Sequence, residues 1–165
     1  MSKSPLKYCE YNIVFQEVPN EVSLVFTISG CPYRCEGCHS SYLQKDIGKN
    51  LKNDFENIFN RYKNFISCVC FMGGDQNEKE LKYFCDLIHN NNIKTALYTG
   101  NDDEDLLVKY NFLDYLKIGH YNKLKGGLDS PFTNQKFFKK LLNGKWEDIT
   151  YIFRKDKLIE NYEKS

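Results

Sequence analysis

The stretch VSLVFTISGCPYRCEGCHS, from Val22 to Ser40, joins an apolar run to three closely spaced cysteines. Its first part is β-branched, aromatic and almost continuously apolar, which is the pattern of a strand buried on both faces. Cys31, Cys35 and Cys38 follow directly, with the spacing C-x3-C-x2-C. The stretch therefore predicts a buried strand over 22–29 whose carboxyl end carries a cysteine loop.

Strand-like and helix-like segments alternate along the rest of the chain. Strands are predicted at 67–72, 94–98, 115–118 and 148–154, and helices at 53–65, 78–90, 102–110 and 133–142. This alternation predicts an α/β fold with a largely parallel sheet. A complete eight-unit barrel needs about 250 residues, so a chain of 165 residues suits a partial, open (βα) barrel.

Composition narrows the classes of function. The formal net charge is +1, which gives no field for gathering nucleic acid, and no apolar run is long enough to span a membrane. The amino terminus lacks the apolar core of a signal peptide, so we expect a cytoplasmic protein whose seven cysteines are thiols or ligands rather than disulfides. We expect one domain over 1–165, with an amino-terminal arm at 1–12 and a flexible tail at 155–165.

Glycine-containing loops follow four of the predicted strands. The sequences SGC, GGD, YTG and IGHY each come where a strand ends. In barrels and open parallel sheets, the active site lies at the edge formed by the carboxyl ends of the strands. We therefore expect the cysteine loop, the Gly73-Gly74-Asp75 loop and the two later loops to converge on one site.

The number of cysteines in the loop indicates which kind of metal centre the loop can hold. A structural zinc site uses four protein ligands, and no second cysteine pair follows this loop. A 4Fe-4S cluster has four irons, so three cysteines would leave one iron open to another ligand. An open coordination position indicates a reactive metal rather than a structural one. A zinc-stabilised binding module remains the alternative that is not an enzyme.

With MGGD at 72–75 ending the second strand, the cysteine loop resembles the signature of the radical S-adenosylmethionine (SAM) enzymes. SGCPYRCEGCHS, FMGGD, LYTG, DYLKIGHY and TNQKF occur in the order typical of the activating proteins of anaerobic (class III) ribonucleoside-triphosphate reductases. The chain resembles that family from Tyr11 to about Arg154. The resemblance implies a partial barrel of the radical SAM type.

The resemblance also implies cofactors, partners and site residues. Cys31, Cys35 and Cys38 would hold a 4Fe-4S cluster with one open iron, which would bind SAM. The residues that would bind this cofactor lie in the cysteine and glycine loops: Gly37, Cys38, His39, Gly73, Gly74 and Asp75. The activity would be abstraction of hydrogen from a glycine of the large glycyl-radical subunit of the reductase. A flavodoxin or ferredoxin-type protein would supply the electron.

Several positions depart from the better-known members and leave the partner open. The chain has FQEVPNEVSL where they carry a glycine-rich, arginine-containing segment, Ile118 where they often have aspartate, Gln76 where they have proline, and Lys136 where they have arginine. The alternatives are another glycyl-radical protein or a small molecule such as a deazapurine precursor.

The remaining polar and sulfur-containing residues allow two interpretations each. Cys68, Cys70 and Cys85 lie in apolar segments and are predicted to be core residues. Four further residues receive no firm role, because packing or loop bridging explains them as well as a functional contact does: Cys9, Tyr98, His120 and Asn134.

Overall fold

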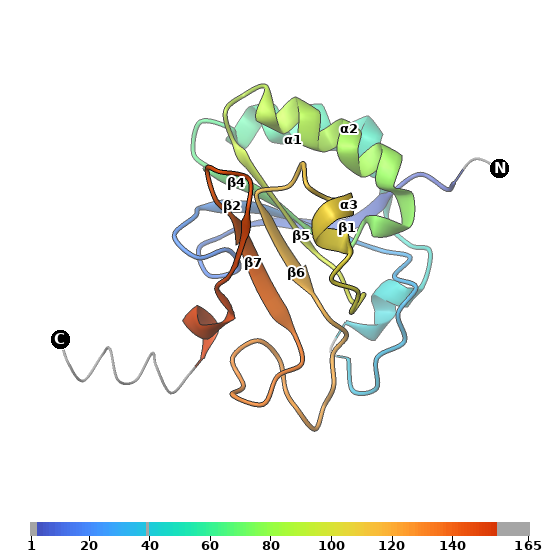
Figure 1. Cartoon of the computed structure of the whole chain (residues 1–165). Helices are drawn as coiled ribbons and strands as arrows, with labels where there is room; N and C mark the ends of the chain where they lie inside the picture. Colours follow the sequence, from blue (N-terminus) through green and yellow to red (C-terminus); the bar gives the residue numbers. More distant parts are fainter. Residues whose placement is uncertain (1–2, 39, 155–165) are drawn as a thin grey trace.

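The computed structural model describes residues 3–38 and 40–154, and a single mixed sheet organises the fold (Figure 1). The eight strands of this part of the chain lie in the order β3-β1-β2-β4-β5-β6-β7-β8. Their bounds are β1 (Lys7–Val14), β2 (Ser23–Ile28), β3 (Lys49–Asn50), β4 (Cys68–Met72), β5 (Lys94–Tyr98), β6 (Tyr115–Ile118), β7 (Lys136–Lys140) and β8 (Trp146–Asp148). In the described residues, every helix is too short or too polar to cross a membrane.

Parallel pairing is confined to the centre of the sheet. Strands β2, β4, β5 and β6 pair in parallel, whereas the outer pairings β3–β1, β1–β2, β6–β7 and β7–β8 are antiparallel. The expectation of a largely parallel sheet is therefore wrong at both edges. The reason is that β1 reaches β2, and β6 reaches β7, without a crossover helix, which antiparallel neighbours do not need.

Three α-helices accompany the central strands. They are α1 (Leu51–Tyr62), α2 (Glu78–His89) and the single-turn α3 (Leu106–Lys109). Asn50 and Asn77 cap the first two, because each side chain accepts a hydrogen bond from a backbone N–H of the first turn. Figure 1 shows α1 and α2 side by side, in agreement with the 4.7 Å between the ring centroids of Phe55 and Phe84.

The sheet separates two apolar layers, because alternate residues of each central strand face opposite sides. The larger layer packs the helices against one face, with Phe26 of β2, Phe71 of β4 and Leu97 of β5 at its centre. The smaller layer lies on the other face and contains the following buried residues: Val18, Val25, Cys68, Cys70, Ala96, Tyr115, Phe137 and Ile149. The prediction that Cys68, Cys70 and Cys85 are core residues is confirmed, since all three are fully buried.

The chain ends differ most from the sequence-based expectations. The segment 133–142 contains strand β7 rather than a helix, and 148–154 contains the end of β8 followed by a 3-10 helix, Thr150–Phe153. The expected arm at 1–12 joins the sheet from Lys7 onward as β1. The expected tail at 155–165 lies outside the described residues.

The outermost strands of the sheet are its shortest. Strand β3 at one edge has 2 residues, and β8 at the other has 3, two of which are acidic. Strand β3 pairs only with Lys7 and Tyr8 of β1, so the rest of β1 has a strand neighbour on one side within the described residues.

Candidate functional site

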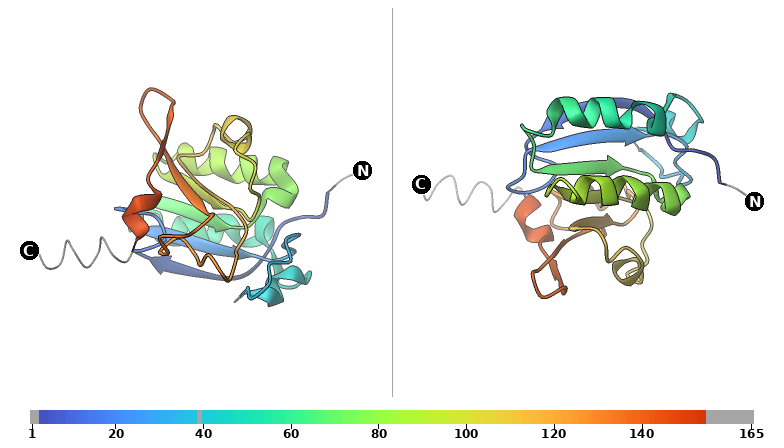
Figure 2. Two further views of the ribbon diagram at one scale, coloured as in Figure 1. Left: turned by 60° about the horizontal axis from the view of Figure 1, so that its bottom comes forward. Right: turned by 90° about the horizontal axis from the view of Figure 1, so that it is seen from above.

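Four parallel strands end at one edge of the sheet, and the loops beyond them border a cavity of about 200 Å³. Figure 2 shows β2 and β4 pointing toward the side of the molecule where the cysteine loop lies. The cysteine loop follows β2, Gly73 follows β4, Thr99 and Gly100 follow β5, and Lys117 stands on β6. The predicted convergence of these loops is thus observed in the cavity lining: Ile28, Cys31, Pro32, Tyr33, Cys38, Ser40, Leu43, Gln44, Met72, Gly73, Asp75, Gln76, Tyr98, Thr99, Gly100 and Lys117.

The three loop cysteines border two different hollows. Cys31 and Cys38 line the 200 Å³ cavity, whereas Cys35 borders a second hollow of about 290 Å³. All three are free and half-buried. Burial raises the pKa of the Cys31 thiol, and the nearby negative charges of Asp75, Cys35 and Cys38 act in the same direction.

The donor set fits an iron–sulfur cluster in its chemistry. Three half-buried thiols on one short loop are the soft ligands that iron–sulfur clusters use. Within residues 3–38 and 40–154, no group of three or more His, Cys, Asp or Glu side chains already has the arrangement of a metal site. The loop thus supplies three thiols without holding them as a closed set of ligands.

The glycine loop has a backbone that side chains would strain. Gly73 and Gly74 have φ angles of 92° and 123°, in the region that favours glycine. The N–H of Gly73 donates to the carbonyl of Tyr98 at 2.9 Å. Gln76, which stands where proline was expected from the family resemblance, donates from Nε2 to the carbonyl of Ser29 at 2.8 Å. Gln76 therefore joins the glycine loop to the start of the cysteine loop.

Asp75 connects three of the converging loops. Its Oδ2 accepts hydrogen bonds from the hydroxyl of Tyr33 at 3.0 Å and from Oγ1 of Thr99 at 2.8 Å. Tyr33 belongs to the cysteine loop, and its carbonyl accepts a weak hydrogen bond from the thiol of Cys31 at 3.7 Å. The ring of Tyr33 also packs on Gly100, where an added Cβ would lie 2.9 Å from Cδ2 of the ring. Asp75 and Gly100 therefore hold the cysteine loop against the end of β5.

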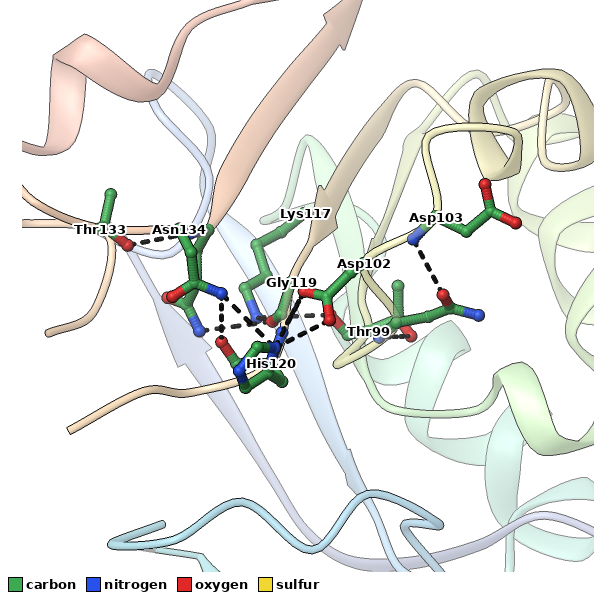
Figure 3. Close-up of polar contacts among 10 residues, drawn as sticks. Thr99, Asp102, Asp103, Lys117, Gly119, His120, Thr133 and Asn134 are labelled. Atoms are coloured by element: carbon green, nitrogen blue, oxygen red, sulfur yellow. Dashed lines mark hydrogen bonds and ion pairs between the residues drawn. The ribbon is translucent and has the colours of Figure 1, made fainter. Parts of the chain in front are cut away.

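Lys117 is a site residue that sequence reasoning did not assign. It is 8% exposed and lines the cavity from β6. Its Nζ donates to the carbonyl oxygens of Gly119 at 2.7 Å and Thr99 at 3.3 Å, as Figure 3 shows. Burial lowers the pKa of Lys117 to about 8. The sequence feature that could have identified Lys117 is the presence of a lysine within the otherwise apolar strand sequence YLKI.

His120 belongs to a polar cluster just beyond β6 (Figure 3). Its Nδ1 lies 2.8 Å from Oδ2 of Asp102, and its carbonyl accepts from Nδ2 of Asn134 at 3.1 Å. His120 borders the second hollow with Cys35 rather than the 200 Å³ cavity. Asn134 thus joins the two ends of the loop between β6 and β7.

The other predicted or unassigned residues are distributed as follows. Gly73, Asp75 and Cys38 line the cavity, Gly37 and Gly74 are absent from the lining formed by the described residues, and His39 lies outside those residues. Tyr98 lines the cavity, and its hydroxyl donates to the carbonyl of Glu17. Cys9 lies on β1 beside the carboxyl end of β2, but it is not among the residues that line the cavity.

Residues 21–144 match the family described as 4Fe-4S single cluster domain, which is found in radical SAM-type proteins. The matched residues are well over half of the 165-residue chain and include the whole cysteine loop. The chain is therefore an iron–sulfur protein, and it belongs to this 4Fe-4S single cluster domain family. No curated protein and no solved structure matches the chain significantly.

Proposed function

We propose that this chain is a radical SAM activase that installs a glycyl radical on the large subunit of an anaerobic ribonucleoside-triphosphate reductase. Cys31, Cys35 and Cys38 hold the 4Fe-4S cluster. When bound, the cluster and SAM supply reductive cleavage of the sulfonium and the 5′-deoxyadenosyl radical that abstracts hydrogen. The observation that carries the proposal is that two free thiols, Cys31 and Cys38, meet the glycine loop at one cavity, with Cys35 on the same short loop, in a chain of a 4Fe-4S family.

The parallel centre of the sheet supports the finer assignment of the fold. Strands β2, β4, β5 and β6 run in parallel, and the helices pack against one face of them. The loops at their carboxyl ends form the cavity. We therefore propose that this centre is a partial, open (βα) barrel of the radical SAM type, to which β1, β3, β7 and β8 add antiparallel edges.

The chain's own residues bind and shield the cofactors in this proposal. Gly73 leaves the backbone beside the cavity uncovered, because it carries no side chain, and Gly74 follows it in the same loop. Asp75 keeps the cysteine loop in place through Tyr33 and offers an acceptor for the ammonium group of SAM. Gly37 and Cys38 add backbone contacts from the cysteine loop.

A macromolecular substrate suits the surface around this edge. The loop between β6 and β7 exposes Leu124 and Phe132, with relative exposures of 88% and 77%. Such side chains can bind a segment of another protein. We therefore propose the glycyl-radical subunit as substrate and a flavodoxin or ferredoxin-type protein as electron donor, both acting in the cytoplasm.

The test begins with anaerobic reconstitution with iron and sulfide, followed by electron paramagnetic resonance of the reduced protein with and without SAM. The expected result is a cluster signal that changes on addition of SAM, and formation of 5′-deoxyadenosine. Cys35→Ala should lose the signal, whereas Cys9→Ala, at a half-buried cysteine outside the loop, should retain it. A colourless, air-stable protein with one zinc would overturn the proposal in favour of a structural metal module.

The identity of the substrate protein is tested by a separate measurement. Incubation with the large reductase subunit should produce a glycyl-radical signal on that subunit. Production of 5′-deoxyadenosine without that signal would exclude the reductase as the substrate. It would favour another glycyl-radical protein or a small molecule as the substrate.

A further inference from the structure

Lys117 places a cation in the wall of the cavity that Cys31 and Cys38 also line. The residue sits on β6 and faces the side of the sheet on which Tyr98 lies, with its Nζ 6.0 Å from the centroid of the Tyr98 ring. Removing an ammonium from water is unfavourable unless nearby groups compensate for the lost hydration. The groups that compensate for the lost hydration of the Lys117 ammonium therefore indicate its role.

The hydrogen-bond partners of Lys117 are neutral. Its Nζ uses two donors for the carbonyl oxygens of Gly119 and Thr99. An ammonium group has three donors. Among the ion pairs of residues 3–38 and 40–154, none within 4.0 Å involves Lys117. The positive charge of Lys117 is thus not neutralised by a directly bound carboxylate in the described part of the chain.

Anionic groups do surround Lys117 at longer range. Cys35, Asp102, Cys31 and Asp75 all stabilise its charged form electrostatically. Two of these four residues are proposed ligands of the cluster. Because Lys117 is buried, solvent screens its interaction with that anionic centre less than it would screen an exposed charge.

We propose that Lys117 is a positioning residue whose positive charge, at pH 7, makes the cluster easier to reduce. The inference rests on the proposed ligation by Cys31, Cys35 and Cys38, but not on the binding of SAM. A one-electron reductant of the ferredoxin, flavodoxin or dithionite type loses one electron and the cluster gains it. No bond forms or breaks in this step. Lys117 favours the more negative, reduced state, because net charge near a cluster is a determinant of its potential.

A purely structural role for Lys117 makes a different prediction. Its two hydrogen bonds join the end of β5 to the end of β6, and a neutral amide can make similar bonds. Lys117→Gln keeps donors for the two carbonyls and removes the charge, whereas Lys117→Arg keeps the charge. If Lys117 only joined the loops, all variants that take up the cluster would have the wild-type potential.

The experiment is an anaerobic redox titration of the reconstituted protein without SAM, followed by electron paramagnetic resonance. Wild type is compared with Lys117→Met, Lys117→Gln and Lys117→Arg. The matched control is Lys123→Met, because Lys123 is an exposed lysine paired with Glu36 of the cysteine loop at 2.6 Å. We expect the Met and Gln variants to have a more negative midpoint potential, and the Arg and control variants to stay near wild type.

An unchanged midpoint potential in Lys117→Gln would overturn the inference. If Lys117→Met fails to take up iron, the comparison of the Gln and Arg variants decides the question in the same way. A wild-type cluster that never cleaves SAM would refute the proposed activase and leave this comparison intact. A wild-type protein that takes up no 4Fe-4S cluster at its loop cysteines would instead refute the proposed ligation.

Discussion

Burial divides the cysteine residues into two chemical groups. Cys68, Cys70 and Cys85 are fully buried, and burial raises the pKa of each thiol far above its ordinary value. The four others are half-buried: Cys9, Cys31, Cys35 and Cys38. Since the thiolate is the reactive form and needs access to reagents, the two groups should differ sharply in reactivity.

A thiol titration of iron-free protein tests this division. Four of the seven cysteines should react with a disulfide reagent in the folded state, and all seven after unfolding in denaturant. In protein loaded with the cluster, only Cys9 should remain reactive. Rapid modification of all seven in folded protein would contradict the burial of the β4 and α2 thiols.

Lys117 makes stability depend on pH in a defined window. Its pKa is lowered from 10.5 to about 8 in the folded state, so between these values the unfolded chain binds more protons. The stability of iron-free wild type should therefore rise with pH relative to Lys117→Met, which lacks this titration, by on the order of 3 kcal/mol in total. Urea unfolding at several pH values from 7 to 10.5 measures the difference.

A matched variant and a defined negative result complete this test. Lys123→Met, at an exposed lysine, should follow wild type across the window. A constant difference between wild type and Lys117→Met at every pH would show that the lysine does not titrate in the folded state as described.

At the scale of elements, the ends of β2, β4 and β5 are joined by side chains from their loops. Tyr33 and Thr99 both donate to Asp75, and Gln76 donates to the carbonyl of Ser29. The cysteine loop is therefore supported by two other strand ends rather than by its own hydrogen bonds alone.

Tyr33→Phe tests this support. The change removes the hydroxyl that donates to a carboxylate, which we expect to cost about 1–2 kcal/mol. Hydrogen exchange of the amides in 31–38 should become faster, while exchange in β4 and β5 should remain slow. Tyr42→Phe is the control, because Tyr42 lies in the neighbouring 3-10 helix and is 46% exposed. Equal exchange in both variants would contradict the role of Tyr33.

The sequence predicts the central elements well and the edges poorly, for a physical reason. The strand at 94–98 and the strand at 115–118 are confirmed with the same bounds, because short and mainly apolar segments buried on both faces are distinctive. The sequence FFKK at 137–140 is equally compatible with one face of a helix. In the structure Phe137 and Phe138 enter opposite apolar layers through antiparallel pairing with β6, a long-range effect that local sequence does not encode.

The candidate site, too, was predicted only in part from the sequence. Spacing alone located the cysteine and glycine loops, because their chemistry is carried by neighbouring residues. Lys117, Thr99 and Tyr33 are brought together by three different strand ends, so their contacts depend on the register of the sheet. The lysine also occupies a strand position where an apolar residue was the simpler expectation.

At the scale of the molecule, the larger apolar layer, which packs the helices against the sheet, contains most of the buried aromatic residues. Phe84 of α2 is 1% exposed and packs against the rings of Phe55 and Phe71. Phe84→Ala should lower the free energy of unfolding by about 3–5 kcal/mol, because it leaves a cavity between α1, α2 and the sheet. Urea unfolding of the iron-free protein measures this loss.

Phe65→Ala provides the control for this whole-molecule test. Phe65 lies just after α1 and is 74% exposed, so its removal should change the unfolding free energy by less than about 0.5 kcal/mol. Similar losses in the two variants would contradict the assigned core.

The short outer strands have a consequence for how molecules of this protein meet. A long open edge offers unpaired N–H and C=O groups to a strand from another molecule, which is the usual route to fibrils. Here β3 has 2 residues, and β8 has 3 residues that include Glu147 and Asp148. In the described part of the chain, the β8 edge thus gives a second copy little backbone to extend and repels an acidic strand, whereas the outer side of β1 beyond Tyr8 pairs with no strand and is where a strand from a second copy would add.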